Sequence, residues 1–312
     1  MKNQLHSIVV PVYQSRDILK VLVDRVSKVM NDAGLTFEMV LVDDGSQDGS
    51  FEKIKQLVAL HKFIRGFKLS RNFGQQQALV IGLRESRGDF VAIIDDDLQD
   101  PPEMLSKFFQ ILYEGADVAY GVRKGRKEGF IKKFLYAAFY KTLSLLTNVE
   151  IPLHAGDFCA MRRRVVDIML QFQEANPFLR GIRAWIGFKQ VGIEYERAVR
   201  NKGKSGYTLR KYFNFAITGM IMFSYLPLRI TTFMGILATA ISTLYLVVII
   251  LVWLFIIPFK VPGYLSLVVI ITFLGGVQLI SIGVIGEYIA RLGDNVRKWP
   301  VAIVAEETSE DK

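Results

Sequence analysis

Apolar and polar residues form alternating blocks over the first hundred positions of the chain. Short apolar runs that end in turn-forming residues indicate buried strands, and longer stretches with helical periodicity indicate helices. Repeated strand-helix units predict a Rossmann-like α/β fold with a mostly parallel sheet. The pattern predicts strands at 7–13, 37–44, 64–69 and 90–94, and helices at 17–30, 50–61 and 75–85.

Two later stretches, 230–259 and 261–286, contain no charged residue. Because about 20 apolar residues cross a bilayer core, they predict two transmembrane helices joined by a hairpin. A buried helical hairpin in a soluble protein is the alternative. Arg229 precedes the pair and Arg291 follows it, and the positive-inside rule then places both ends in the cytoplasm. We therefore expect an inner-membrane protein with two spans.

These patterns divide the chain into four parts. We expect a cytoplasmic α/β domain at 1–206, an amphipathic juxtamembrane helix at 207–228, two transmembrane helices within 229–290 and a cytoplasmic tail at 291–312. The end of the tail is polar and charged, which predicts disorder. The stretch 130–146 fits either a helix at the membrane interface or a core helix. A small membrane hairpin also favours a homo-oligomer.

Composition narrows the chemistry. The only cysteine, Cys159, excludes an internal disulfide, and three histidines make a histidine metal site unfavourable, so a metal would be held by oxygen. The net charge of +9 accompanies basic residues beside apolar segments, which favours anionic lipid over nucleic acid. The first residues hold no long apolar signal core, so export of the amino-terminal half is not expected.

The predicted strand at 90–94 runs directly into Asp95, Asp96 and Asp97. Carboxylates this close repel one another, and Mg²⁺ or Mn²⁺ is the usual compensating cation. In an extended segment Asp95 and Asp97 point to one side and Asp96 to the other, so the first and third can share a metal. The alternative is an acidic turn in which Asp100, before two prolines, caps the next helix. That alternative explains Asp100 but not the other three.

Six motifs carry a family resemblance. In chain order they are PVYQSRD, LVDDGSQDGS, LSRNFGQQQAL, DDDLQDPPEM, AGDFCAMRR and RNKGKSGY, followed by the two apolar stretches. Together they resemble the family 2 glycosyltransferases of GT-A fold that charge polyprenyl phosphates, of the bactoprenol glucosyltransferase and dolichol-phosphate mannose synthase type. The resemblance covers nearly the whole chain. It implies metal-dependent transfer of a hexose, with UDP-glucose favoured as donor, to undecaprenyl or another polyprenyl phosphate, with inversion.

The resemblance also implies roles for residues on the donor side. Asp95, Asp97 and Gln99 match the metal-facing positions, and Asp96 belongs to the same acidic motif as a supporting residue beside the donor. The positions expected to hold the base and ribose are Pro11, Tyr13 and Asp44, with Asn72 bringing its backbone close to the nucleotide. Each has a simpler reading, since Pro11 can end a strand, and Asp44 and Asn72 lie in turn sequences. Asp43 is expected to be structural, and Gln14-Ser15 departs from the family's usual Asn-Glu.

On the acceptor side, Asp157 matches a position near the reacting sugar, and Asp157, Asp97 and Arg200 are the expected catalytic residues. A lipid phosphate is already anionic, so Asp157 is expected to orient a substrate rather than remove a proton. Its alternative is the N-cap of the following helix. Arg123, Arg126, Arg200 and Lys204 are expected at the acceptor phosphate, with solvated surface charge as the alternative.

Three other functions remain open at this point. A processive polysaccharide synthase would carry a QxxRW motif and more membrane helices, and the sequence has neither. Transfer of mannose from GDP-mannose, as in the dolichol-phosphate group, is the nearest enzymatic alternative. A non-catalytic membrane scaffold could retain the fold, but the intact acidic motif favours an enzyme.

Overall fold

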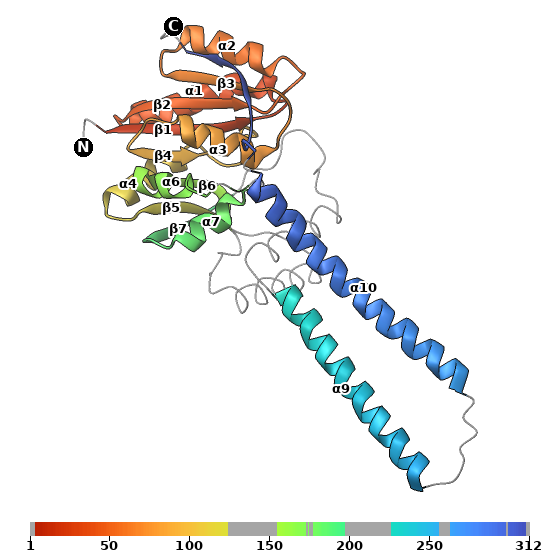
Figure 1. The fold of residues 1–312 in the computed structure, drawn as a ribbon. Coiled ribbons are helices and arrows are strands. Elements are labelled where there is room, and N and C mark those ends of the chain that lie inside the picture. The colour runs from red at the N-terminus through yellow and green to blue at the C-terminus, as the bar shows by residue number, and fades with distance from the viewer. Residues whose placement is uncertain are drawn as a thin grey trace. The chain divides into compact units, whose positions relative to one another are not determined.

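The computed structural model describes residues 4–123, 155–172, 174, 177–196, 226–255, 263–297 and 299–309. The chain forms two compact units (Figure 1). One is an α/β unit that includes the last residues of the chain. The other contains the long helices α9 (Leu226–Phe255) and α10 (Gly263–Val296).

The α/β unit is built on one eight-stranded sheet with the order β7-β5-β6-β4-β1-β2-β3-β8. Its strands are β1 (Leu5–Val12), β2 (Thr36–Asp43), β3 (Ile64–Leu69), β4 (Phe90–Ile93), β5 (Val118–Arg123), β6 (Ala155–Arg162), β7 (Gln190–Tyr195) and β8 (Val304–Thr308). β6 and β8 run antiparallel to their neighbours, whereas β4, β1, β2 and β3 are mutually parallel. The predicted mostly parallel sheet is confirmed.

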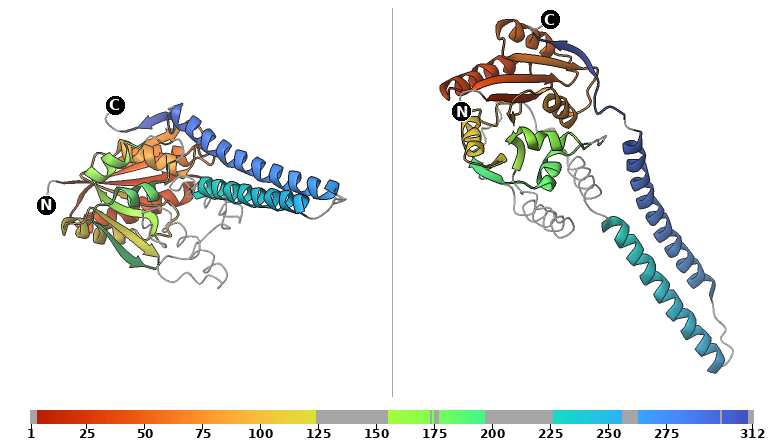
Figure 2. Two further views of the ribbon diagram at one scale, coloured as in Figure 1. Left: turned by 60° about the horizontal axis from the view of Figure 1, so that its bottom comes forward. Right: turned by 60° about the vertical axis from the view of Figure 1, so that its left-hand side comes forward.

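Helices cover both faces of this sheet (Figure 2). Alternate residues of β1 explain why. Ile8 and Val10 belong to a core shared with α1, α2 and α4, whereas Val9 lies against Gly82 of α3. A Cβ at Gly82 would come within 2.3 Å of the Val9 side chain, so α3 packs this closely only because Gly82 has none. The helices are α1 (Arg16–Asp32), α2 (Ser50–Leu60), α3 (Gln75–Glu85), α4 (Met104–Tyr113), α6 (Arg163–Met169) and α7 (Leu179–Ile186).

Part of the tail, Val304–Thr308, forms a strand, which corrects the disorder predicted for that part. β8 pairs antiparallel with β3, with Phe67 opposite Glu307. Composition misled because the charged residues have partners here: Glu306 pairs with Lys55, and Glu307 lies 3.6 Å from Arg65. Backbone pairing and these ion pairs together order a segment whose side chains are mostly polar.

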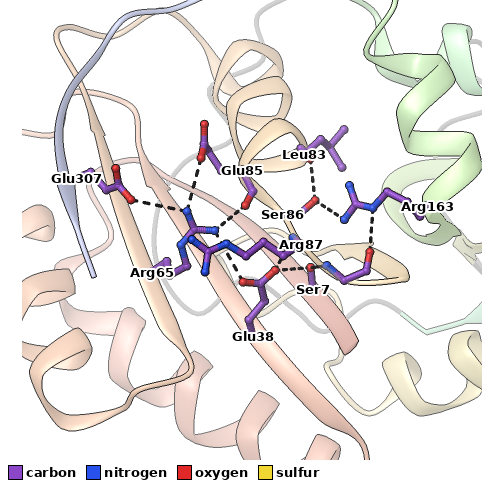
Figure 3. A network of polar contacts seen from close by, with 10 residues as sticks. Ser7, Glu38, Arg65, Leu83, Glu85, Ser86, Arg87, Arg163 and Glu307 are labelled. Atoms are coloured by element: carbon purple, nitrogen blue, oxygen red, sulfur yellow. Dashed lines mark hydrogen bonds and ion pairs between the residues drawn. The ribbon is translucent and has the colours of Figure 1, made fainter. Parts of the chain in front are cut away.

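The starts of the parallel strands, which we call the amino rim, carry a buried polar network (Figure 3). Its centre is Arg65, which is 8% exposed. The guanidinium lies 3.8 Å from Glu38, 3.5 Å from Glu85 and 3.6 Å from Glu307, and it donates to the Glu85 carbonyl at 2.6 Å. Ser7 donates to Glu38 at 2.6 Å. Several carboxylates therefore share one cation on this side of the sheet.

The helical unit consists of α9 and α10, which contact each other. In the part of the chain that the structure describes, one segment, Phe273–Ala290, is long and apolar enough to cross a membrane, and Thr231–Tyr245 of α9 is a shorter apolar segment. Both predicted helices are present, and α10 extends beyond position 290 to Val296. That these helices span a membrane stays a prediction. The predicted helix at 130–146, and all but the last three residues of the one at 207–228, lie outside the described residues.

Candidate active site

The carboxyl ends of the parallel strands, which we call the carboxyl rim, gather the predicted site residues. Tyr13 follows β1, Asp44 follows β2, and Asp95 follows β4. β6 runs the opposite way, and its register places Cys159 against Ile93. Asp95 comes two residues after Ile93, and Asp157 comes two residues before Cys159 on the antiparallel strand, so both lie at the same rim. The convergence expected from parallel topology is confirmed.

The acidic segment is a turn and not an extended strand. β4 ends at Ile93, and the chain turns at 96–98, where Leu98 has a φ of 56°. The alternation that placed Asp95, Asp97 and Gln99 on one side is therefore wrong as geometry. Gln99 is 7% exposed, and its backbone N–H donates to Asp97 at 3.1 Å. The metal roles of these residues stay predictions.

Asp96 has a supporting contact of the kind predicted for it. Its carboxylate accepts the backbone N–H of Tyr13 at 3.1 Å, which joins the acidic turn to the end of β1. Burial raises the pKa of Asp96 to about 6, although hydrogen bonds from Ser15 and Tyr13 act to lower it. Asp96 thus fixes the loop after β1.

Asp95 lies where negative charges crowd together. Gln75, at the start of α3, donates to Asp95 at 2.7 Å. Burial, and then the charges of Asp100, Asp157, Asp97 and Asp96, raise the pKa of Asp95 to about 8. A carboxylate in such a field binds either a proton or a cation. This part of the rim therefore has the donor set that a hard divalent ion prefers.

A complete protein cage for such an ion is not preformed. Among the described residues, no group of three or more His, Cys, Asp or Glu side chains is gathered closely enough to hold a metal by itself. Mg²⁺ is usually held by one or two carboxylates together with substrate phosphates, so a partial site of oxygen donors fits this chemistry.

Asp100 does not cap the next helix. The N-cap position of α4 is Glu103, and the first helical N–H groups bond to the carbonyls of Pro101 and Pro102. Asp100 is fully buried and accepts a hydrogen bond from the Tyr195 hydroxyl. The capping interpretation is wrong because the prolines' carbonyls already serve the helix start, which leaves Asp100 to point inward.

Asp157 does not cap a helix either, because it lies inside β6, and α6 begins at Arg163. Two side chains reach the same oxygen, Oδ2: Gln76 donates at 3.1 Å, and Arg180 donates at 3.3 Å. Burial acts to raise the pKa of Asp157, but Arg180 and its neighbours outweigh it and lower the pKa overall. Asp157 is held as a carboxylate with one oxygen fixed.

Asp44 holds the turn that leads into α3. Its carboxylate accepts the backbone N–H groups of Phe73 at 2.7 Å and Gly74 at 2.9 Å. Gly45 follows with a φ of 69°, and a Cβ there would meet the Arg71 carbonyl carbon at 2.5 Å. The backbone after β2, at Gly45, thus lies close to the backbone of the turn after β3, at Arg71. Asn72 is exposed on this second turn. Asp44 is therefore a structural support at the predicted nucleotide site.

The end of β1 presents an aromatic ring to solvent. Tyr13 is 47% exposed, whereas Pro11 is buried within the strand opposite Val42 and does not end it. Gln14 has a φ of 52° and donates its backbone N–H to Ser46. Asp43 is fully buried and accepts the Ser46 N–H, in keeping with a structural role. The stacking of Tyr13 on a base stays a prediction, with which its exposed ring is compatible.

Of the four cations predicted for the acceptor, one falls within the described residues. Arg123 ends β5, donates to the Tyr195 hydroxyl at 3.3 Å and lies 3.9 Å from Asp100. Arg126, Arg200 and Lys204 lie outside the described residues.

Sequence reasoning missed four site residues. Gln75 and Gln76 begin α3 and reach Asp95 and Asp157, and Arg180 pairs with Asp157. A run of three glutamines directly after a glycine-bearing turn was an available signal, as were Arg180 and Arg183 spaced three apart in a short helix. Tyr195 carries no local signal, because its partner Asp100 is 95 positions away.

Comparison with known proteins identifies the family. The model of glycosyl transferase family 2 matches residues 7–169. An uncharacterized glycosyltransferase of Bacillus subtilis is 38% identical, over 96% of this chain and 93% of that protein. The SfII prophage-derived bactoprenol glucosyl transferase of Shigella flexneri is 36% identical, over 96% of each chain.

A solved structure, the mannosyl-3-phosphoglycerate synthase of Rubrobacter xylanophilus, is 18% identical and matches 70% of this chain and 72% of that one, with a TM-score of 0.47. That likeness is too weak to bear on activity. The family match and the full-length relatives agree with the convergence of acidic residues on the carboxyl rim. The chain belongs to glycosyltransferase family 2.

Proposed function

We propose that the chain transfers glucose from UDP-glucose to undecaprenyl phosphate at the cytoplasmic face of the membrane. The observation that carries the proposal is the crowding of Asp95, Asp97 and Asp157 on the carboxyl rim of a family 2 domain. The bactoprenol glucosyl transferase of Shigella flexneri matches over nearly its full length, which supports a polyprenyl phosphate as acceptor. The sugar and the nucleotide rest on that relationship alone.

The reaction needs little covalent help from the protein. An oxygen of the lipid phosphate attacks the anomeric carbon, the bond from that carbon to the nucleoside diphosphate breaks, and in-line geometry inverts the configuration. The nucleophile is already anionic, so no proton must be removed. Asp157, held ionised by Arg180 and Gln76, orients the sugar or the acceptor. Tyr13 stacks on the base, and the Asp44-supported turn borders the nucleotide.

The residues of the acidic turn fit a divalent cation. Asp95 and Asp97, with Gln99, would hold Mg²⁺ or Mn²⁺, and the raised pKa of Asp95 shows the negative field that such an ion relieves. When bound, the ion stabilises the charge that grows on the leaving diphosphate.

The helical unit supports attachment to a membrane. α10 contains a segment that is long and apolar enough to span a bilayer, and α9 carries the shorter apolar segment. Arg229 in the first turn of α9, together with Arg291 and Arg297 near the end of α10, favours a cytoplasmic α/β unit by the positive-inside rule. A donor made in the cytoplasm and an acceptor held in the bilayer would then meet at the membrane surface.

The direct test is transfer of radiolabelled sugar to undecaprenyl phosphate by the purified full chain. A panel of UDP- and GDP-sugars is supplied with Mn²⁺, with Mg²⁺ and with EDTA. We expect labelled lipid with UDP-glucose and its loss in EDTA. Asp97→Asn removes a charge at the carboxyl end of β4 and should lower the rate by roughly 100-fold or more.

Asp89→Asn is the matched control, because Asp89 is an exposed carboxylate just before β4, at the opposite end of the same strand. Its rate should stay within about threefold of the wild type, as expected for an exposed substitution away from the site. Label from GDP-mannose instead would move the donor to the mannose alternative. No product with any donor, from a folded protein, would overturn the proposal in favour of a non-catalytic scaffold.

A further inference from the structure

The most completely buried carboxylate of the acidic segment is Asp100, and the sequence does not explain its burial. It is fully buried and accepts a hydrogen bond from the Tyr195 hydroxyl, while the Arg123 guanidinium lies 3.9 Å away. Arg123 also donates to the Tyr195 oxygen at 3.3 Å. These three groups form a closed polar cluster, which we call the Asp100 cluster.

The cluster lies where three chain segments meet. Arg123 is the last residue of β5, Tyr195 is the last residue of β7, and the parallel register pairs these two positions. Asp100 comes from the acidic turn, three residues after Asp97. One carboxylate therefore joins the ends of two neighbouring strands to the segment that contains the predicted metal ligands.

Packing around Tyr195 shows that this position is specified. The ring is 5% exposed, lies edge-on to Phe158 at 5.6 Å, and sits against Gly121, where a Cβ would come within 2.6 Å of it. A phenylalanine would fill the same space. The hydroxyl therefore contributes its hydrogen bonds separately from the packing of the ring.

Charge gives the cluster a connection to the donor site. Asp100 is the strongest charged influence on Asp95, and Arg123 also lies within the field of Asp95. Moving Asp100 would change the potential at Asp95 and the path of the turn that carries Asp97. Binding of a diphosphate and its cation requires these groups to be held in place in advance.

We infer that Tyr195 is a positioning residue, which fixes Asp100 and Arg123 and thereby holds the acidic turn ready for the nucleoside diphosphate and its divalent cation. The inference rests on the proposed function. It assigns site roles to Tyr195 and Asp100, neither of which the sequence motifs place at the site. It also implies that the ends of β5 and β7 and the donor-binding turn behave as one unit.

The test compares the loss of one tyrosine hydroxyl at two places in the fold. Tyr195→Phe removes the hydroxyl at the carboxyl rim. Tyr113→Phe removes a hydroxyl that bonds to His6 at 2.8 Å, beside the start of β1, and is the matched control. The full-length wild type and both variants are titrated with UDP in the presence of Mn²⁺ by calorimetry, and thermal midpoints are recorded for all three.

We expect Tyr195→Phe to raise the dissociation constant of UDP by about tenfold, because a hydrogen bond to a charged group is lost, with the half-activating Mn²⁺ concentration rising in parallel. Tyr113→Phe should change the UDP dissociation constant and the half-activating Mn²⁺ concentration by no more than about twofold, because its hydroxyl is remote from the acidic turn. This should hold even if its thermal midpoint falls as much as that of Tyr195→Phe. A purely structural role for Tyr195 would lower the midpoint without this difference.

Asp100→Asn is the second variant, for use if Tyr195→Phe does not fold. It keeps the size of the side chain and an acceptor for Tyr195 but removes the charge beside Asp95, so it should weaken UDP and Mn²⁺ binding in the same direction. Equal dissociation constants for wild type, Tyr195→Phe and Tyr113→Phe would overturn the inference alone. A folded wild type that binds no UDP would overturn the proposed function and the inference with it.

Discussion

The two rims of the sheet bury carboxylates in different ways. At the amino rim, Arg65 lies among Glu38, Glu85 and Glu307, and Asp117 pairs with arginines of α6 and β6. At the carboxyl rim, Asp95 accepts a hydrogen bond from the neutral Gln75 side-chain amide. The charged groups that act on Asp95 are mainly other carboxylates. The same side-chain type thus serves stability on one side of the sheet, whereas around Asp95 it leaves negative charge that the proposed divalent cation would offset.

The largest expected loss of sugar-transfer activity is at Asp157 of the carboxyl rim. Asp157→Asn removes the charge held by Arg180 at the carboxyl rim, and we expect kcat for sugar transfer, taken per folded molecule, to fall by roughly 100-fold or more. Initial rates at saturating donor and acceptor measure it. An unchanged kcat would remove Asp157 from the reaction.

Its counterpart is Asp117→Asn at the amino rim. Asp117 is 5% exposed and bonds to Arg164 and to the Lys189 N–H. We expect this variant to lose about 1–3 kcal/mol of unfolding free energy and to keep its kcat per folded molecule. Chemical denaturation gives the first quantity, and the same rate assay gives the second.

Removing the shared cation tests the amino rim directly. Arg65→Met leaves Glu38, Glu85 and Glu307 without their arginine, so we expect about 2–4 kcal/mol of destabilisation by denaturant unfolding. Arg25→Met is the control, because Arg25 and Glu103 form an exposed pair whose loss should cost less than about 1 kcal/mol. Equal losses in the two variants would show that the network contributes no more than a surface pair.

The crowding of carboxylates at the carboxyl rim should make stability depend on pH. The folded-state pKa of Asp95 is raised to about 8, so between about pH 4 and 8 the folded chain holds a proton that the unfolded chain has released. The unfolding free energy of the metal-free protein should therefore fall as pH rises through this window. Asp96, raised to about 6, adds to the lower part of it.

Thermal midpoints in EDTA measured across this window test the sign. Asp95→Asn should flatten the profile and raise the midpoint at about pH 8, because a neutral amide has no charge to bury. Mn²⁺ should have the same direction of effect on the wild type. The pKa of Asp157 is lowered, so its contribution is lost only at pH values below this window. A midpoint that rises with pH in EDTA would contradict the crowding described for Asp95.

The smallest expected effect is at Gln76, a neutral side chain that bonds to Asp157 at the carboxyl rim. Gln76 donates to Asp157 and accepts the N–H of Leu179, so Gln76→Ala should lower kcat by roughly fivefold, the size of one neutral hydrogen bond. Gln77→Ala is the control, since the Gln77 amide faces the carbonyls of Phe73 and Gly74. Similar losses in the two variants would assign the effect to the start of α3 as a whole.

The strands and helices of the first hundred residues could be predicted because each is specified locally. Periodicity predicted α3 at its observed bounds and β4 to within one residue, and the expected parallel topology correctly brought Asp44 and Asp95 to one rim. Local rules failed where the chain leaves the sheet. Alternation does not apply to Asp97 once the turn begins, and capping does not apply to Asp100 once its partner Tyr195 is present.

The missed contacts share a physical cause. Arg180 and Asp157 are 23 positions apart, and Gln76 and Asp157 are 81 apart, so their pairing depends on strand order. A surface arginine cannot be told from a site arginine by its sequence alone. The charged tail was predicted to be disordered because the sequence does not show that β3 has a free edge with which β8 can pair. The family resemblance placed Asp157 near the reacting sugar, which stays a prediction, and it gave none of the partners of Asp157 in this structure.

The place of β8 has a consequence for how the chain is made. β3 ends at Leu69, but its outer neighbour, Val304–Thr308, is synthesised after both long helices. On the ribosome the outer edge of β3 therefore stays open until both long helices have been made, and an unpaired strand edge is a template for association with other chains. Truncated products that stop within α10 would expose this edge permanently, so quality control of the nascent protein has a specific feature to recognise.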